Sequence, residues 1–102
     1  MDDVRDVWQR FKVLPGSSQI SSPFALAGVS WWLTRRHPTL ILEVGGGIGC
    51  ASDTLRHWAE GRPCLVVVVE DNPWCLDQWR RNVRPSLEVR LAVTAPPWTW
   101  DF

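Results

Sequence analysis

Hydrophobic residues follow two helical patterns in the first third of the chain. Val4, Val7 and Phe11 recur at helical spacing, which predicts an amphipathic helix within the first dozen residues. A polar loop follows that helix. Ser22 and Pro23 then suit the N-cap and the first turn of a second helix, whose apolar residues are spread around most of its surface. Two helices are therefore expected before the first strand.

The rest of the chain alternates between strand and helix patterns. Strands are expected at residues 40–44, 65–69 and 87–93, and helices at residues 52–60 and 73–83. The second strand, Leu-Val-Val-Val-Val, is apolar at every position, which is typical of a strand buried on both faces. The third alternates apolar and polar residues, which predicts an edge strand with one wet face.

Strand, helix, strand, helix, strand forms two consecutive crossover units, and such crossovers are almost always right-handed. The pattern predicts an α/β fold, with a Rossmann-like parallel three-stranded sheet in the order 3-2-1 and flanking helices. No linker divides the chain, so residues 1–102 are expected to form a single Rossmann-like domain. Within it, residues 1–20 supply an N-terminal helix and loop, and residues 21–102 the core.

Candidate chemistry is concentrated in the segment Glu43-Val44-Gly45-Gly46-Gly47-Ile48-Gly49, where the first strand meets a helix. Glycines at such a turn permit positive φ and let a ligand approach the backbone. The free N–H groups of the following helix favour polar or negative ligand groups. Glu70 and Asp71 follow the second strand, where a carboxylate can accept hydrogen bonds from the ribose hydroxyls of a nucleotide.

The spacing Glu43-x-Gly45-x-Gly47-x-Gly49 resembles the first motif of class I S-adenosylmethionine-dependent methyltransferases, and the resemblance runs from about Ser21 to the end of the chain. It implies a partial methyltransferase fold with S-adenosylmethionine as cofactor. The glycine turn, Gly46 included, would pass beside the methionine portion of the cofactor, and Glu43 would hold its amino group. The residues after the second strand would serve the ribose (Glu70) and the adenine edge (Asp71).

The resemblance has two departures. The residues after the third strand are Thr94-Ala95-Pro96-Pro97, where many members of the family place an acidic residue near the adenine. The family sheet has seven strands, and Trp100-Asp101-Phe102 resembles only the beginning of the fourth. The acceptor-binding half is therefore missing from this chain, and no catalytic residue or methyl acceptor can be assigned. The exposed edge of the first strand would invite self-association.

Three functions remain open. The first is the cofactor-binding half of a methyltransferase, which would transfer a methyl group if missing strands completed it. The second is a non-catalytic, truncated module that binds a nucleoside cofactor or a partner protein. The third is a fragment of an NAD-binding oxidoreductase, which the acid at position 43 and the glycine spacing disfavour.

Charge and cysteine content limit the partners. Eleven basic and eleven acidic residues cancel, so nothing in the net charge attracts nucleic acid or a membrane surface. Three cysteines without a Cys-x-x-Cys spacing indicate no metal site and fit a reducing cytoplasm. Cys50 lies at a helix N-terminus, which can lower the pKa of a thiol, but a packing role is favoured. The helical tryptophans at positions 31, 32, 58, 74 and 79 are expected in the core.

Overall fold

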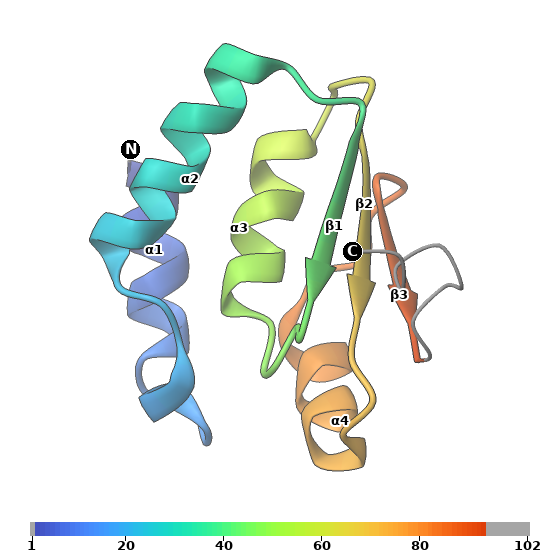
Figure 1. The fold of residues 1–102 in the computed structure, drawn as a ribbon. Helices are drawn as coiled ribbons and strands as arrows, with labels where there is room; N and C mark the ends of the chain where they lie inside the picture. The colour runs from blue at the N-terminus through green and yellow to red at the C-terminus, as the bar shows by residue number, and fades with distance from the viewer. Residues whose placement is uncertain (1, 94–102) are drawn as a thin grey trace.

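The computed structural model describes residues 2–93, and it consists of helices on one side of a small sheet (Figure 1). The predictions for residues 94–102, including the beginning of a fourth strand, lie outside the described range. The elements are α1 (Asp2–Phe11), the 3₁₀ helix η1 (Ser17–Gln19), α2 (Pro23–Arg36), β1 (Leu40–Val44), α3 (Cys50–Ala59), β2 (Leu65–Val69), α4 (Pro73–Asn82) and β3 (Val89–Ala92).

The three strands form one parallel sheet in which β2 lies between β1 and β3. Across the sheet, Ile41 of β1 is opposite Val66 of β2, which is opposite Val89 of β3. The predicted α/β fold and the strand order 3-2-1 are confirmed. Because all strands are parallel, their carboxyl ends lie at one edge of the sheet, where ligands bind in folds of this kind.

Capping residues fix the beginnings of two helices. The Ser22 hydroxyl accepts a hydrogen bond from the Ala25 N–H at 3.1 Å, as the sequence predicts for α2. The Asn72 side chain does the same for the Cys75 N–H at 3.0 Å at the beginning of α4. Helix α3 begins at Cys50, two residues earlier than expected, so the helix follows the glycine turn directly.

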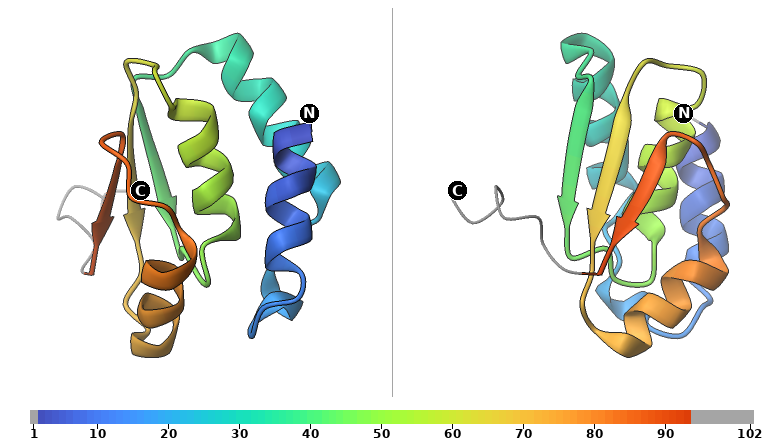
Figure 2. Two further views of the ribbon diagram at one scale, coloured as in Figure 1. Left: turned by 180° about the vertical axis from the view of Figure 1, so that it is seen from behind. Right: turned by 90° about the vertical axis from the view of Figure 1, so that its right-hand side faces the viewer.

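Helices α3 and α4 pack against one face of the sheet, and α1 and α2 lie on the outer side of α3, with Leu33 of α2 reaching the same core cluster (Figures 1 and 2). Val66 and Val68 point toward the helices and are fully buried. Leu65, on the opposite face, is 38% exposed. The prediction that β2 is buried on both faces is therefore correct only in part, since Val67 on the second face is half-buried and only Val69, at the carboxyl end, is buried there. No described helix covers that face, which carries the apolar side chains of Leu40, Leu42, Val44, Leu65, Val67 and Val69.

The expectation that the helical tryptophans lie in the core is correct only in part. Trp79 is buried and Trp58 is half-buried, but Trp31, Trp32 and Trp74 are each about half exposed. Helix α2 is apolar around most of its surface, whereas its buried side chains are only Leu26 and Leu33. The periodicity identifies the helix but cannot tell which of its faces meets the core.

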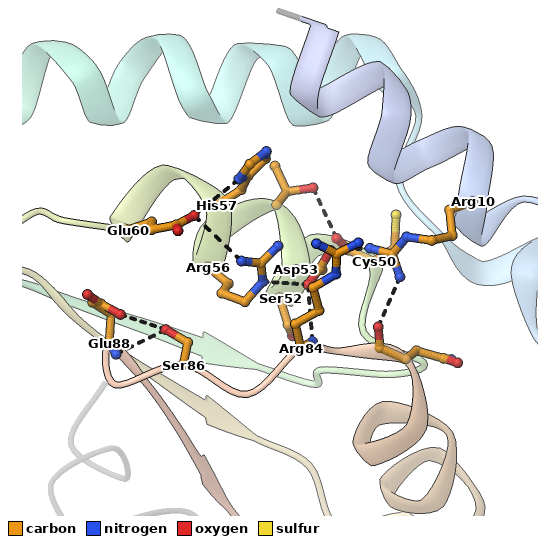
Figure 3. Close-up of polar contacts among 12 residues, drawn as sticks. Arg10, Cys50, Ser52, Asp53, Arg56, His57, Glu60, Arg84, Ser86 and Glu88 are labelled. Atoms are coloured by element: carbon orange, nitrogen blue, oxygen red, sulfur yellow. Dashed lines mark hydrogen bonds and ion pairs between the residues drawn. The ribbon is translucent and has the colours of Figure 1, made fainter.

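A buried ionic cluster ties the N-terminal helix to the glycine-turn region (Figure 3). Asp53 of α3 is fully buried and forms ion pairs with Arg10 of α1 and with Arg56, the latter at 2.7 Å. The Arg10 guanidinium also donates to the Asn82 carbonyl at 3.0 Å, and the Asn82 side chain donates to the Ile48 carbonyl at 3.0 Å. Helices α1, α3 and α4 are thereby linked beneath the turn.

Among the described helices, none has the combination of length and hydrophobicity that a membrane-spanning helix needs.

Candidate functional site

The glycine turn lies at the carboxyl end of β1 and leads into α3 (Figure 1). Gly45, Gly47 and Gly49 all adopt positive φ, at 82°, 57° and 106°. The N–H groups of Gly45 and Gly46 both donate to the Val69 carbonyl, at 2.8 and 3.2 Å. The turn is therefore anchored to the end of β2 and exposes its outer side beyond the sheet edge.

The glycines of the turn have two different roles. A Cβ at Gly45 or Gly47 would have no atom within 4 Å, so these residues border open space. A Cβ at Gly46 would come within 2.6 Å of Val68, and one at Gly49 within 2.4 Å of the Val83 side chain. Gly46 and Gly49 thus permit close packing, whereas Gly45 and Gly47 leave the backbone accessible to a ligand.

Glu70 follows β2 and bridges the glycine turn to the loop that leads into α4. Its Oε1 accepts from the Gly47 N–H at 2.7 Å, and its Oε2 accepts from the N–H groups of Asp71 and Asn72 at 3.1 and 2.9 Å. The residue is 8% exposed, so these bonds satisfy a nearly buried carboxylate. Asp71, in contrast, is exposed to solvent.

Glu43, in β1, is the most strongly perturbed acid of the site. Burial raises the pKa of Glu43 from its ordinary value of 4.5 to about 7; a hydrogen bond from Ser52 opposes the rise, and the negative charge of Glu70 adds to it. The Ser52 hydroxyl donates to Glu43 Oε1 at 2.5 Å. Near neutral pH this carboxyl group is therefore close to its midpoint of titration, and a cationic partner would stabilise its charged form.

A hollow of about 210 Å³ opens beside Glu43 and the turn. Gly45, Gly46 and Gly47 form one wall, and the first turns of α3 and α4 supply further lining residues, among them Trp74. Gly49, Glu70 and Asp71, which the sequence also predicts at the site, do not line the hollow. The predicted site residues therefore divide into those that line the hollow and those that do not.

Sequence reasoning missed the wall that residues 16–21 contribute to this hollow. Gly16 has a φ of +86°, and a Cβ there would lie 2.8 Å from the Ile48 side chain and 3.0 Å from Trp74. The loop therefore approaches the glycine turn as closely as a glycine allows. The Pro15-Gly16 pair signals a turn, but nothing local shows what the turn packs against.

Cys50 also lines the hollow, but its environment is not that of a reactive thiol. Burial, with a smaller contribution from the negative charge of Asp53, raises the pKa of Cys50 to about 11. Arg10 opposes this increase only in part. The suggestion that the helix N-terminus lowers this pKa is wrong, because desolvation outweighs the helix dipole; the packing role is supported by the position of Cys50 in the core cluster around Phe11.

A larger hollow, of about 640 Å³, lies on the helical side of the molecule and is lined mainly by residues of α2 and α3, including Trp31 and Trp58. None of the residues of the glycine turn lines it. Size alone therefore does not locate the functional site; the strained turn, the perturbed acid and the strand ends favour the smaller hollow. Among the described residues, no group of three or more His, Cys, Asp or Glu side chains could hold a metal ion.

Comparison with solved structures identifies the fold. The SAH-bound methyltransferase PaMTH1 of Podospora anserina matches 90% of the chain, with a TM-score of 0.73 and 19% identity. The chain has a partial methyltransferase fold. A putative caffeoyl-CoA O-methyltransferase of Staphylococcus aureus matches 89% of the chain, with a TM-score of 0.65 and 18% identity. The fibrillarin/Nop5p complex matches 70%, with a TM-score of 0.51 and 15% identity.

The match covers only a part of those proteins. The chain spans 41% of PaMTH1, 42% of the Staphylococcus protein and 36% of the matched chain of the fibrillarin complex. Neither protein-family models nor curated protein sequences give a match. The resemblance to class I methyltransferases thus has support from the three-dimensional fold, and it applies to a part of that fold.

Proposed function

We propose that the chain binds S-adenosylmethionine at the glycine turn and forms the cofactor-binding half of a methyltransferase. The observation that carries the proposal is the arrangement of Glu43 and Glu70 around Gly45 and Gly47, at which a side chain would meet no atom. The methyltransferase fold and the SAH-bound neighbour support the same ligand. The sulfonium and ammonium groups of this cofactor are cations, which suit a site with two carboxyl groups.

The residues present fit the two ends of the cofactor differently. Glu43 lies at the hollow beside the open glycines and would hold the amino group of the methionine portion. A carboxylate has about four acceptor positions, and the three backbone bonds of Glu70 leave one on Oε1 for a ribose hydroxyl. Asp71, which is exposed beside it, would lie near the adenine edge.

The bound cofactor would supply an activated methyl group, so little acid–base chemistry is required of the protein. This chain's residues would hold and orient the two ends of the cofactor, and the buried side of the turn would exclude water. Residues 16–21 border the same hollow, so we assign them to the binding domain together with the core. The acceptor and its pocket would come from structure beyond the part that this chain shares with its neighbours.

The two alternative functions are separable from this one. NAD would bring a pyrophosphate to the turn, where the carboxylate of Glu43 would repel it. A non-catalytic module would bind S-adenosylmethionine without transferring its methyl group. Ligand binding therefore distinguishes an NAD-binding fragment from the two functions that use S-adenosylmethionine. Methyl transfer to an acceptor then distinguishes the methyltransferase half from the non-catalytic module.

Isothermal titration of the purified chain with S-adenosylmethionine, S-adenosylhomocysteine and NAD tests the proposal. We expect the first two to bind and NAD not to bind. In Glu70→Ala the affinity should fall at least about tenfold, as expected for losing a charge-assisted contact. In Gly47→Ala it should fall by a similar factor, because the added Cβ would occupy the open space beside the turn. Gly61→Ala is the matched control for Gly47→Ala, since Gly61 also has positive φ and open space around its Cβ position but lies away from the turn. Absence of binding by a folded chain would refute the proposal.

We also propose that two copies of the chain associate through β1 and the adjacent open sheet face. β1 pairs with β2 on one side, and no described strand pairs with its other edge. That edge offers free backbone donors and acceptors beside an apolar face. Sedimentation equilibrium should show a dimer that Leu40→Lys abolishes and Leu87→Lys preserves, because exposed Leu87 lies outside the sheet. A monomeric wild-type chain would refute this arrangement.

A further inference from the structure

Two side chains in sequence-distant helices form a buried hydrogen-bonded chain that ends on Glu43. The indole N–H of Trp79, in α4, donates to Ser52 Oγ at 2.8 Å, and the Ser52 hydroxyl donates to Glu43 Oε1 at 2.5 Å. Ser52 is fully buried and Trp79 is 8% exposed. The Trp79 ring also lies 3.2 Å from the position that a Cβ of Gly46 would take, so it packs against the glycine turn.

The direction of these hydrogen bonds is fixed by chemistry. An indole nitrogen can only donate, so Ser52 Oγ must accept from Trp79. The proton of the Ser52 hydroxyl is then available for Glu43, and the hydroxyl is held in the orientation that serves the carboxylate. A bond that reaches a carboxyl group as a donor favours its charged form. The chain thus opposes the cost of burying the charge on Glu43.

We propose that Trp79, acting through Ser52, is a positioning residue that favours the ionised form of Glu43 and directs its carboxylate at the cationic amino group of the cofactor. This inference rests on the function proposed above and adds to it a dependence of cofactor affinity on pH. Neither residue belongs to the glycine motif or to the acids of the strand ends. Their role follows only from the contacts between α3, α4 and β1.

The ionisable groups around Glu43 show which one changes its charge near neutral pH, and their contacts single out Glu43 itself. Glu70 approaches from the end of β2 and disfavours the Glu43 charge. Cys50 of α3 and Cys75 of α4 line the same hollow, and burial raises the pKa of both thiols, so both stay neutral through neutral pH. Residues 16–21 contribute no ionisable side chain. The change in charge between pH 6 and 8 is therefore assigned to Glu43.

This assignment predicts a bell-shaped dependence of affinity on pH. On the acidic side the affinity should increase as Glu43 loses its proton near pH 7. On the alkaline side it should decrease as the amino group of the free cofactor loses its proton, at a pKa of about 8 for an α-amino group. The acidic limb belongs to the protein and the alkaline limb to the ligand, which gives every titration an internal reference.

The experiment is calorimetric titration of S-adenosylmethionine between pH 5.5 and 9 with wild type, Trp79→Phe and Ser52→Ala. Both variants should move the acidic limb to higher pH and weaken binding roughly tenfold below pH 7, with little change at pH 8 and an unmoved alkaline limb. Trp58→Phe is the control, because the Trp58 indole donates to Thr34 at 3.1 Å away from the glycine turn. It should leave both limbs in place.

Equal loss of affinity at every pH in folded Trp79→Phe and Ser52→Ala would show that the two residues act only by packing, and would overturn the inference. Carbon-13 titration of the Glu43 carboxyl group in the ligand-free chain provides a readout that needs no cofactor. Its midpoint should rise in both variants, and an unchanged midpoint would also overturn the inference. If the wild-type chain binds no S-adenosylmethionine but the midpoint rises, the proposed function fails while the ionisation effect of Trp79 stands.

Discussion

Replacement of Glu43 by glutamine should stabilise the protein while it weakens cofactor binding. A raised pKa in the folded state means that the folded protein holds its proton more tightly than the unfolded chain. The stability that this provides is complete below about pH 4.5 and is lost as pH rises through about 7. A shift of one pKa unit corresponds to about 1.4 kcal/mol, so the rise in the pKa of Glu43 from 4.5 to about 7 lowers the stability of the folded state by about 3 kcal/mol at pH 8.

Glutamine keeps an oxygen that can accept from Ser52 but carries no charge. The gain in the free energy of unfolding of Glu43→Gln over wild type should therefore be about 1 kcal/mol at pH 5 and should increase to about 3 kcal/mol at pH 8. Urea denaturation at intervals between pH 5 and 9 measures this difference. Glu60→Gln is the control, since that side chain is 67% exposed and its change should stay within about 0.5 kcal/mol. Parallel stability curves for wild type and Glu43→Gln would refute the reasoning.

Two further substitutions test what holds the turn in place. Asp53→Asn leaves two arginines without their shared buried partner and should lower the free energy of unfolding, measured by urea denaturation, by about 3–5 kcal/mol. The control Asp77→Asn removes an exposed ion pair and should lower it by less than about 0.5 kcal/mol. Equal losses in the two variants would contradict the role of the buried cluster. Gly49→Ala places a Cβ at positive φ and close to Val83, so it should lower the free energy of unfolding by at least about 2 kcal/mol more than Gly61→Ala, where the added Cβ has positive φ but meets no atom. Adding Val83→Ala to Gly49→Ala should restore part of the lost stability. If it restores none, the contact with Val83 is not the cause.

The elements that the sequence predicts correctly are those whose signals are local. Ser22 and Asn72 each cap the helix that follows, and the residues between them alternate strand and helix patterns. Crossover handedness then leaves a single strand order for three parallel strands. The sequence predicts the glycine turn at the end of β1 for the same reason, because the glycines and the elements on either side of them are contiguous in the sequence.

The features that the sequence could not predict depend on which surfaces meet. Apolar residues in β2 do not show that one face of the sheet lacks a described helix, and the tryptophans of α2 do not show which of them face solvent. Likewise, no spacing rule brings Gly16 to Ile48 or Trp79 to Ser52, since both contacts join distant segments. Binary patterning determines the elements, whereas their contacts determine the walls and the charge state of the site.

The glycine turn shows how closely these two levels are coupled. Gly46 and Gly49 permit contact with Val68 and Val83, and that contact leaves Gly45 and Gly47 as the part of the turn that faces open space. The same packing brings the Trp79 ring beneath the turn and its N–H to the residue that bonds Glu43. Stability and binding therefore depend on one set of contacts: a substitution that loosens the packing should alter the charge at the site, and removal of the charge should strengthen the fold.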